Sequence, residues 1–349
     1  MKKIVLLTGA AGAVGLETLE ELIRRKDQYT VRVIEVRNRR TERTLRPFRQ
    51  EAEICWVDLT DRGAVEACVQ DVDRVIHLAA IIPPLADRQP ALAERVNVRG
   101  TQNLIEALRQ NAPEAFLLYS SSVSVYGDRV RNPWIKVTDL LRPSEGDYYA
   151  VTKIKAEQLI RNSGLPWSIF RLTGIFNPQQ KLDPLFFHMP LETCIEMATT
   201  RDTGYALVQA LEHGAELQGR TFNLGGGEKC RVIYRDLLEG CFAITGLGAM
   251  DFPPEAFADH NFHCGYFLDS AELEQILHFQ RDSFEDYLNW YAHYVPALRR
   301  WLARVLQRTI KHYLLGQSDP YRAWRRRDRK LMQRFFRQVK LAPGTASIR

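Results

Sequence analysis

The sequence contains no run of about 18 apolar residues, which excludes a helix that spans a bilayer. Its six cysteines lie far apart, with no CxxC pair and no histidines at zinc-ligand spacing, so reduced thiols and no metal site are expected. The N-terminus lacks the length and cleavage site of a signal peptide, which predicts a cytoplasmic protein. With 45% hydrophobic and 26% charged residues, the chain has the composition of a water-soluble globular protein.

Charge is unevenly distributed along the chain. Residues 297–349 contain 15 lysines and arginines against two acids, a net charge of +13, whereas the whole chain carries +6. The first 296 residues therefore carry −7, and the basic character belongs to the C-terminal tail. A basic tail indicates a binding surface for a partner or a localisation signal more readily than an active site.

The first half of the chain alternates short β-branched runs with segments of helical spacing, the pattern of a parallel sheet covered on both faces. Strands are predicted at residues 3–7, 30–36, 54–57, 74–78, 116–120, 167–171 and 221–224. Helices are predicted at residues 14–25, 62–70, 91–110, 149–162 and 202–213. The fold class is therefore α/β, with a doubly wound parallel sheet about six or seven strands wide.

Three regions follow from this pattern. Residues 1–175, with about 200–225, are predicted to form the sheet domain. Residues 176–199 and 226–296 form a small C-terminal cap that closes over the carboxyl ends of the strands and binds the substrate, a small molecule. Residues 297–349 form a basic, amphipathic, helical tail.

A glycine-rich turn follows the first predicted strand and opens the first predicted helix. Gly9, Gly12 and Gly15 permit a tight turn and let backbone N–H groups approach a pyrophosphate, which the helix N-terminus holds electrostatically. A plain strand-to-helix turn also contains glycines, but the flanking strand and helix favour a dinucleotide site.

Tyr149 and Lys153 stand four residues apart, which places both side chains on one face of a helix. An ammonium beside a phenol favours the phenolate and brings its pKa of about 10 closer to working pH, where acid/base catalysis is efficient. Tyr148 has no lysine at the fourth following place, so Tyr149 is the candidate. The alternative is an exposed tyrosine and a solvated lysine on an ordinary helix.

Several motifs occur in a characteristic order over about residues 1–225. They are TGAAGAVG at 8–15, Asp58-Leu59, VIHLAA at 75–80, NVRGT at 97–101, SSSVSVYG at 120–127 and YAVTK at 149–153. In this set the chain resembles the extended short-chain dehydrogenase/reductases, also described as the NAD-dependent epimerase/dehydratase family. The resemblance implies a Rossmann fold, an NAD(P)-dependent oxidoreductase or epimerase, and a homodimer paired through the helices that contain Asn97 and Tyr149.

The resemblance also implies roles for individual residues. In the family the tyrosine exchanges a proton with the substrate oxygen, the lysine also binds the nicotinamide ribose, and a serine orients the same oxygen. These catalytic roles map onto Tyr149, Lys153 and Ser122, with Ser121 and Ser124 as alternatives to Ser122. The cofactor-binding residues implied are Gly9, Gly12, Gly15, Asp58, Leu59, Leu78, Ala79, Asn97 and Lys153.

Two further residues have a structural alternative. His77 is interpreted as part of the strand below the cofactor, buried and neutral, rather than as a catalytic base. Arg171 ends a predicted strand near the site, and a structural ion pair is an equal alternative for it.

The choice between NAD and NADP depends on where the second strand ends. Glu35, about 20 residues beyond the glycines, would take a ribose 2′-hydroxyl and indicate NAD. If the strand continues through Arg37 to Arg40, guanidinium groups suit a 2′-phosphate. The sequence favours the second arrangement, with Arg37 in the cofactor site and NADP as the cofactor, and a solvated loop is the alternative.

The residues near the site reduce the number of reactions that the protein could catalyse. Val123-Ser124 occupies the place of the Asp-Glu pair of sugar-nucleotide dehydratases, which argues against dehydration. The apolar segment 186–190 favours a carbonyl or alcohol substrate over a nucleotide sugar. The predicted reaction is therefore hydride transfer that interconverts a ketone and a secondary alcohol. Nucleotide-sugar epimerisation through a transient ketone is the alternative, and a non-catalytic dinucleotide sensor or scaffold is the third.

The tail alternates apolar and basic residues at helical spacing. Its first apolar set is Leu298, Trp301, Leu302, Val305, Leu306, Ile310, Tyr313 and Leu314, and its second is Leu331, Met332, Phe335 and Phe336. Such helices suit an anionic membrane surface, so residues 298–340 are predicted to contact one peripherally. Docking onto the net-negative body or onto another subunit is an equal alternative. Nucleic acid is not an expected partner, because no recognition motif accompanies the charge.

Overall fold

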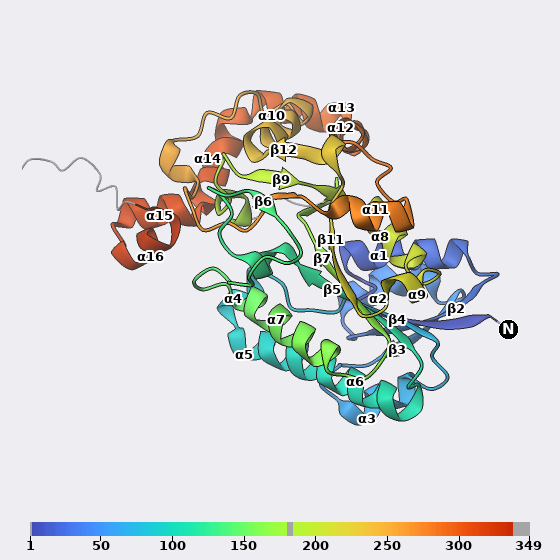
Figure 1. The fold of residues 1–349 in the computed structure, drawn as a ribbon. Coiled ribbons are helices and arrows are strands. Elements are labelled where there is room, and N and C mark those ends of the chain that lie inside the picture. Colours follow the sequence, from blue (N-terminus) through green and yellow to red (C-terminus); the bar gives the residue numbers. More distant parts are fainter. Residues whose placement is uncertain (1, 180–183, 338–349) are drawn as a thin grey trace, which may run out of the picture.

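Seven parallel strands form the main sheet of the computed structural model, which describes residues 2–179 and 184–337 (Figure 1). In spatial order they are β11 (Arg220–Leu224), β7 (Trp167–Leu172), β5 (Phe116–Ser122), β4 (Arg74–His77), β1 (Lys3–Thr8), β2 (Tyr29–Glu35) and β3 (Ala52–Trp56). The predicted doubly wound parallel sheet is confirmed, with each predicted strand present. The chain order reverses between β1 and β4, and ligands of such sheets bind at the carboxyl ends beside that reversal.

Helices cover both faces of this sheet, which is why its strands are apolar runs without alternation. On one face lie α1 (Ala13–Arg24), α8 (Thr200–Gln209), α9 (Gly214–Leu217) and α11 (Ser270–Leu277). On the other lie α3 (Arg62–Cys68), α6 (Gly100–Asn111) and α7 (Tyr148–Arg161). Central-strand residues such as Val5, Leu6 and Leu7 are fully buried between the two layers. The sheet is thus a rigid platform for the loops at its carboxyl edge.

Two local features differ from the sequence prediction. The second strand ends at Glu35, and α2 (Arg39–Leu45) begins soon after it, because the Asn38 side chain accepts hydrogen bonds from the backbone N–H groups of Arg40 and Thr41. The extension of the strand to Arg40 was therefore wrong. The predicted helix 91–110 is interrupted: α5 (Pro90–Ala93) leads into a π-helix, Glu94–Arg99, before α6. Such π-helical turns occur frequently at functional sites.

The cap lies above the carboxyl edge of the sheet and contains three short strand pairs, with helices over them (Figure 1). The pairs are β6 (Trp134–Ile135) with β13 (Tyr266–Phe267), β8 (Ile175–Phe176) with β10 (Ala198–Thr199), and β9 (Cys194–Glu196) with β12 (Arg231–Ile233). The cap helices α10 (Tyr234–Thr245) and α12 (Phe284–His293) lie above these pairs, whereas α4 (Leu85–Arg88) belongs to the sheet domain, where it contacts α5 and α7. An aromatic cluster that includes Phe186, Phe187, Phe242 and Phe257 forms the core of the cap. Residues 180–183 of the predicted cap lie outside the described residues.

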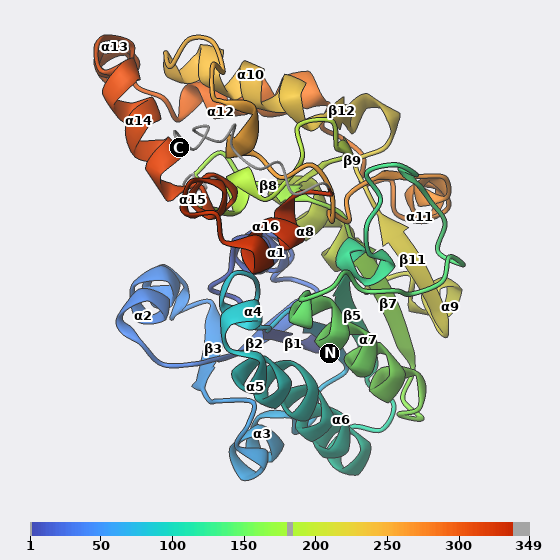
Figure 2. The same ribbon diagram turned by 90° about the vertical axis from the view of Figure 1, so that its left-hand side faces the viewer.

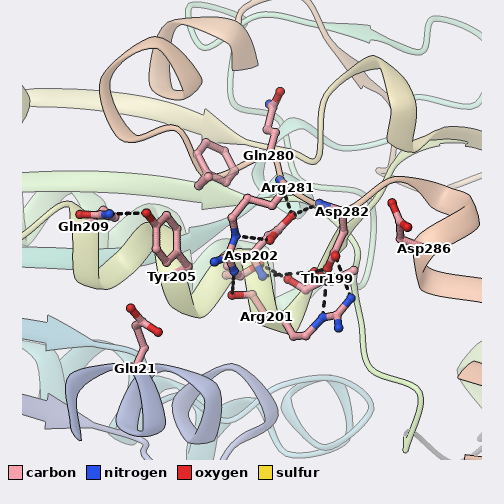
Figure 3. A network of polar contacts seen from close by, with 12 residues as sticks. Glu21, Thr199, Arg201, Asp202, Tyr205, Gln209, Gln280, Arg281, Asp282 and Asp286 are labelled. Carbon is pink, nitrogen blue, oxygen red and sulfur yellow. Dashed lines mark hydrogen bonds and ion pairs between the residues drawn. The ribbon is translucent and has the colours of Figure 1, made fainter. Parts of the chain in front are cut away.

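A polar network joins the cap to the sheet domain (Figure 3). Asp202, on α8 and almost fully buried, accepts hydrogen bonds from the backbone N–H groups of Arg281 and Asp282 at 2.9 and 2.8 Å. Asp282 in turn accepts from Arg201 at 2.7 Å and from the Thr199 hydroxyl at 2.6 Å. Because buried carboxylates need partners, these contacts specify how the cap is seated.

The tail packs against the cap as four helices: α13 (Ala297–Val305), α14 (Gln307–Gln317), α15 (Asp319–Arg326) and α16 (Arg329–Phe335). Leu314 of α14 is buried in the cap core, and Met332, Phe335 and Phe336 are buried against Ala258. Figure 2 shows α15 and α16 returning toward the carboxyl edge of the sheet. Docking onto the body, one of the two equal alternatives, therefore applies to part of the tail, while residues 338–340 lie outside the described residues.

All six cysteines are free thiols. Over residues 2–179 and 184–337, no helix combines the length and the apolarity that crossing a bilayer requires, and no cluster of metal-ligating side chains occurs.

Candidate active site

The structure brings Ser122, Tyr149 and Lys153 together at the carboxyl edge of the sheet. Ser122 ends β5, and Tyr149 and Lys153 lie in the first two turns of α7, which begins where Asp147 accepts a hydrogen bond from the backbone N–H of Ala150 at 2.8 Å. The Lys153 ammonium lies 5.6 Å from the centre of the Tyr149 ring. Hydrogen bonding with Ser122 acts to lower the pKa of Tyr149, so these hydroxyl groups are neighbours.

Lys153 is 2% exposed, and its surroundings hold the ammonium in one place. Its Nζ donates a hydrogen bond to the Ser120 carbonyl oxygen at 2.6 Å and lies 4.6 Å from the centre of the Tyr119 ring. Burial lowers the pKa of Lys153 to about 7, although the nearby Glu157 carboxylate acts to raise it. The lysine therefore changes charge near neutral pH.

The pKa of Tyr149 is raised, which contradicts the expectation of a phenol made more acidic by the lysine. Burial is the largest cause, and the negative charge of Asp147 adds to it, whereas Ser122 acts in the opposite direction. The physical reason is that Lys153 is itself desolvated, so its charge does not outweigh the burial of the phenol. Tyr149 is protonated at neutral pH in the protein alone.

The three candidate serines have different surroundings. The Ser121 hydroxyl donates to Glu157 at 2.6 Å, which directs it away from the tyrosine. The Ser124 hydroxyl is fully buried and, within the described part of the chain, has no hydrogen-bond partner. Ser122 accepts from the backbone N–H of Ser124 at 3.2 Å and is the serine beside Tyr149. The geometry thus favours Ser122 for the orienting role.

Asn97 lies on the π-helix and joins the loop after β4 to α7. Its amide accepts from the Ile81 N–H at 2.7 Å and donates to the Ile81 carbonyl at 3.0 Å and to the Thr152 hydroxyl at 2.9 Å. The side chain is 1% exposed, so these bonds are shielded from water. Asn97 therefore positions the helix that contains Tyr149 and Lys153.

His77, at the end of β4, is buried between two threonines. Its ring nitrogens lie 2.7 Å from the Thr8 hydroxyl and 2.9 Å from the Thr101 hydroxyl. Burial lowers its pKa to about 3, and the charge of Lys153 acts in the same direction. The ring is neutral and fully partnered, in agreement with its interpretation as a structural residue.

The glycine turn has the close packing that a dinucleotide site requires. A Cβ on Gly9, whose φ is +76°, would lie 2.7 Å from the backbone N of Ala79, and one on Gly15 would lie 2.1 Å from the Gly9 oxygen. Gly12 caps α1 without a side chain that occupies its first N–H groups, and the first turn of α1 contains no acid. The residues present therefore fit a dinucleotide pyrophosphate at this helix N-terminus.

Glu35 and Arg37 are placed very differently. The Glu35 carboxylate accepts a hydrogen bond from the backbone N–H of Ala11, in the glycine turn, at 2.9 Å. Burial raises its pKa, partly offset by backbone hydrogen bonds. Arg37 pairs with Glu42 at 2.7 Å, and its side chain is 69% exposed. The acid is at the glycine turn, whereas the arginine is in the surface segment that leads into α2.

The remaining cofactor candidates lie on neighbouring loops of the same edge. The Ala79 N–H donates to the Thr8 hydroxyl at 3.1 Å, and the Leu78 N–H donates to the Thr8 carbonyl at 3.2 Å. Asp58, just beyond β3, accepts from the N–H and the hydroxyl of Thr60, and Leu59 next to it is buried. The structure thus brings the predicted set to the carboxyl edge of the sheet; Arg37 follows β2 there but is largely exposed and paired with Glu42.

Sequence reasoning missed Glu157 as a support of the site. This buried carboxylate accepts from Arg171 at 2.9 and 2.8 Å, and Arg171 also donates to the Tyr126 hydroxyl at 2.9 Å. Although burial acts to raise it, the pKa of Glu157 is lowered by Arg171 and Ser121. Arg171 is therefore in an ion pair, one of its two predicted alternatives. The sequence signal that could have identified Glu157 is its spacing of four residues from Lys153, which repeats the spacing from Tyr149 to Lys153.

The tail also reaches the start of α7, which no local motif indicated. Arg334 on α16 lies 3.6 Å from the Asp87 carboxylate on α4. Burial raises the pKa of Asp87, as does Asp147, whereas Arg334 and the backbone N–H groups that begin α7 lower it. Through Asp87, α16 thus lies near the first turn of α7, which contains Tyr149.

A glycine turn and a Ser-Tyr-Lys cluster at one edge of a doubly wound sheet define the class of dinucleotide-dependent short-chain dehydrogenase/reductases. Residues 5–187, more than half of the chain, match the NAD dependent epimerase/dehydratase family. The chain belongs to this family, as its motifs indicated.

Individual relatives differ in the reactions that their names state. An uncharacterized UDP-glucose epimerase of Bacillus subtilis (strain 168) is 26% identical over 264 residues, which cover 66% of this chain and 78% of that protein. 3 beta-hydroxysteroid dehydrogenase type 7 of Mus musculus is 27% identical over 202 residues, 54% of each chain. The chain therefore spans about half the length of the mouse enzyme.

Solved structures share the fold at low sequence identity. UDP-glucose-4-epimerase of Stenotrophomonas maltophila, with bound NAD and formylated UDP-arabinopyranose, superposes with a TM-score of 0.69 and 20% identity. The match covers 87% of this chain and 99% of that one. It extends the likeness beyond the sheet domain into the cap.

Proposed function

We propose that the protein is an NAD-dependent oxidoreductase that interconverts a ketone and a secondary alcohol on a small, largely apolar molecule. The observation that carries the proposal is the cluster of Ser122, Tyr149 and Lys153, which lies at the same carboxyl edge of the sheet as the glycine turn. The bound nicotinamide supplies or accepts the hydride. The protein supplies the proton and the orientation of the substrate oxygen.

Each residue of the cluster has a role that its surroundings support. Because the pKa of Tyr149 is raised, the phenol holds its proton at neutral pH and donates it to a ketone oxygen during reduction. Oxidation requires the deprotonated form of this oxygen, which takes the alcohol proton, and a protonated Lys153 would stabilise that phenolate. Ser122 donates a hydrogen bond to the substrate oxygen and orients it.

NAD is the proposed cofactor. Glu35 ends β2 and reaches the glycine turn, where a carboxylate accepts hydrogen bonds from ribose hydroxyls and repels a 2′-phosphate. The expectation of NADP depended on a strand that continued to Arg40, and Arg37 is instead exposed and paired. The NAD bound by the Stenotrophomonas enzyme adds support from the family.

The cap supports a substrate without a diphosphate. The apolar segment 186–190 is the sequence feature that favours an apolar ligand, and in the structure its Phe186 and Phe187 are packed in the cap core. Arg231 is committed to Glu196 at 2.9 Å, and Arg235 to Glu192 at 2.6 Å. Those guanidinium groups already have carboxylate partners, so neither is available to a diphosphate without losing one.

Nucleotide-sugar epimerisation is the second candidate, because the Bacillus relative with 78% of its length matched is named as an epimerase. An epimerase returns the hydride to the same sugar and produces no net change in the cofactor. The two candidates are therefore separated by the fate of NADH.

The test is a panel of apolar ketones and UDP-sugars assayed with NADH and NADPH. The proposal predicts NADH oxidation with at least one ketone and its loss in Tyr149→Phe. UDP-sugar isomers formed without net NADH oxidation would support the second candidate instead. Failure of every substrate, together with no binding of either dinucleotide, would contradict both.

A further inference from the structure

One row of apolar side chains on the tail faces solvent instead of the cap. This row, which we name the α13 stripe, consists of Leu298, Trp301, Leu302, Val305 and Leu306. Their exposed fractions are 68, 58, 43, 60 and 48%, respectively. No residue of α13 is buried. Contiguous exposed apolar surface of this kind marks a site of interaction.

The spacing of the stripe is that of a face which normally packs against a core. Its members stand at positions i, i+3, i+4, i+7 and i+8, and Leu306 keeps the row continuous by bonding to Leu302 before it and Ile310 after it. The tail uses other residues to dock on the cap: Ala303 and Ile310 pack against its core, and Leu314 is buried there. The stripe is thus the apolar surface of the tail that stays exposed after the tail has packed against the cap.

Positive charge flanks the stripe on both sides. Arg299 lies along one edge, and Arg304 and Arg308 lie along the other, all three on the surface. Residues 297–318 contain no aspartate or glutamate. An apolar face bordered by arginines, with tryptophan among its members, has the chemistry of a helix that lies in a lipid headgroup layer.

We propose that the α13 stripe binds the surface of a bilayer that contains anionic lipids, with its apolar side chains in the interface and its arginines at the headgroups. Charge favours this occupant over a second copy of the chain. In a symmetric dimer each stripe would face its own duplicate, and the flanking arginines would approach one another. The contact is confined to α13 and the start of α14, because Met332, Phe335 and Phe336 on α16 are buried against the cap.

The proposal is tested by co-sedimentation of the full chain with phosphatidylcholine vesicles that contain or lack phosphatidylglycerol. Wild-type protein is expected to bind the anionic vesicles, and the double variant W301E/V305E to bind more than about tenfold more weakly. R304E/R308E is expected to weaken binding as well, and added salt to weaken the wild type. The matched control is L140E, at an 80% exposed leucine outside the tail, which is expected to bind like the wild type.

Folding and self-association are measured in parallel. All four substituted tail residues are exposed, so the variants are expected to keep the wild-type melting temperature. Absence of binding to anionic vesicles, or equal binding of wild type and W301E/V305E, would overturn the proposal. So would a wild-type dimer in sedimentation velocity that W301E/V305E dissociates without any vesicle binding, since the stripe would then be an interface between copies. None of these readouts depends on turnover.

Discussion

Helices α7 and α13 both combine aromatic and basic residues at helical spacing, but their surroundings are opposite. On α7, Lys153 and Glu157 are almost fully buried, and each has named partners on β5 or β7. On α13 no residue is buried. The comparison teaches that spacing identifies which residues share a face, whereas the rest of the fold decides whether that face is covered. This difference is why we propose chemistry for the first helix and contact with a partner for the second.

The largest expected effect comes from removing the proton donor on α7. Tyr149→Phe deletes one oxygen and should lower kcat by about 10²–10⁴-fold, because a general acid/base contributes that much. Dinucleotide affinity should stay close to the wild-type value. The measurements are steady-state kinetics on an identified substrate and titration calorimetry with NAD. A variant with undiminished turnover would remove Tyr149 from the mechanism.

The buried pair behind the cluster should control stability. Glu157→Ala leaves Arg171 uncompensated and is expected to reduce the free energy of unfolding by about 3–5 kcal/mol, measured by urea denaturation. Because the pKa of Glu157 is lowered in the fold, its contribution is present above the unfolded pKa of about 4 and is lost as the pH falls below it. Glu157→Gln, which keeps the shape, should remove this acid dependence; an unchanged acid midpoint would contradict the assignment.

Lys153 should produce a second pH dependence of the free energy of unfolding. Here the fold disfavours the charged form of the side chain, whereas for Glu157 it favours the charged form. The pKa of Lys153 is about 7 in the fold and about 10.4 in an unfolded chain, so the unfolded chain binds more protons between these values. Stability should therefore rise from pH 7 to pH 10, by about 2–4 kcal/mol. Lys153→Met should show a flatter profile over that interval. Parallel profiles for the two proteins would show that Lys153 is charged throughout.

The cofactor assignment predicts a smaller, selective change. Glu35→Ala removes the carboxylate at the glycine turn and should weaken NAD binding by about tenfold while NADP binding stays level or improves. Arg37→Ala is the matched control at the position that NADP binding would use, and it should change neither affinity. Loss of NADP affinity in Arg37→Ala would instead support NADP, the cofactor that the sequence favours.

The smallest effect is expected where the tail meets α4. Arg334→Ala removes a partly exposed ion pair with Asp87 and should lower stability by less than about 1 kcal/mol. A change in KM with little change in kcat would indicate that this part of the structure also contacts substrate. No change in either kinetic constant would limit Arg334 to a packing role.

Much of the sheet domain was predictable because buried parallel strands are short apolar runs separated by turns. The strand that ends at Ser122 and the helix that holds Tyr149 were located within a few residues. The end of β2 was misplaced because Val36 prolongs its apolar pattern, and the Asn38 cap that begins α2 was not recognised.

Features that depend on distant parts of the chain were not predictable. The π-helix around Asn97 has no propensity signal, and the raised pKa of Tyr149 results from burial rather than from its spacing to Lys153. The tail pattern treated Leu302 and Leu314 alike, although only Leu314 is buried. Which of the two leucines faces the cap is set by how α13, with Leu302, and α14, with Leu314, run across the cap.

The most direct test of the central claim, that the glycine turn and the Ser-Tyr-Lys cluster form one dinucleotide site, is calorimetric titration with NAD of the wild type, Gly15→Val and Tyr149→Phe. The account predicts saturable binding to the wild type and to Tyr149→Phe, and its loss in Gly15→Val, whose side chain would overlap the Gly9 carbonyl. No binding by the wild type, or equal binding by Gly15→Val, would contradict it.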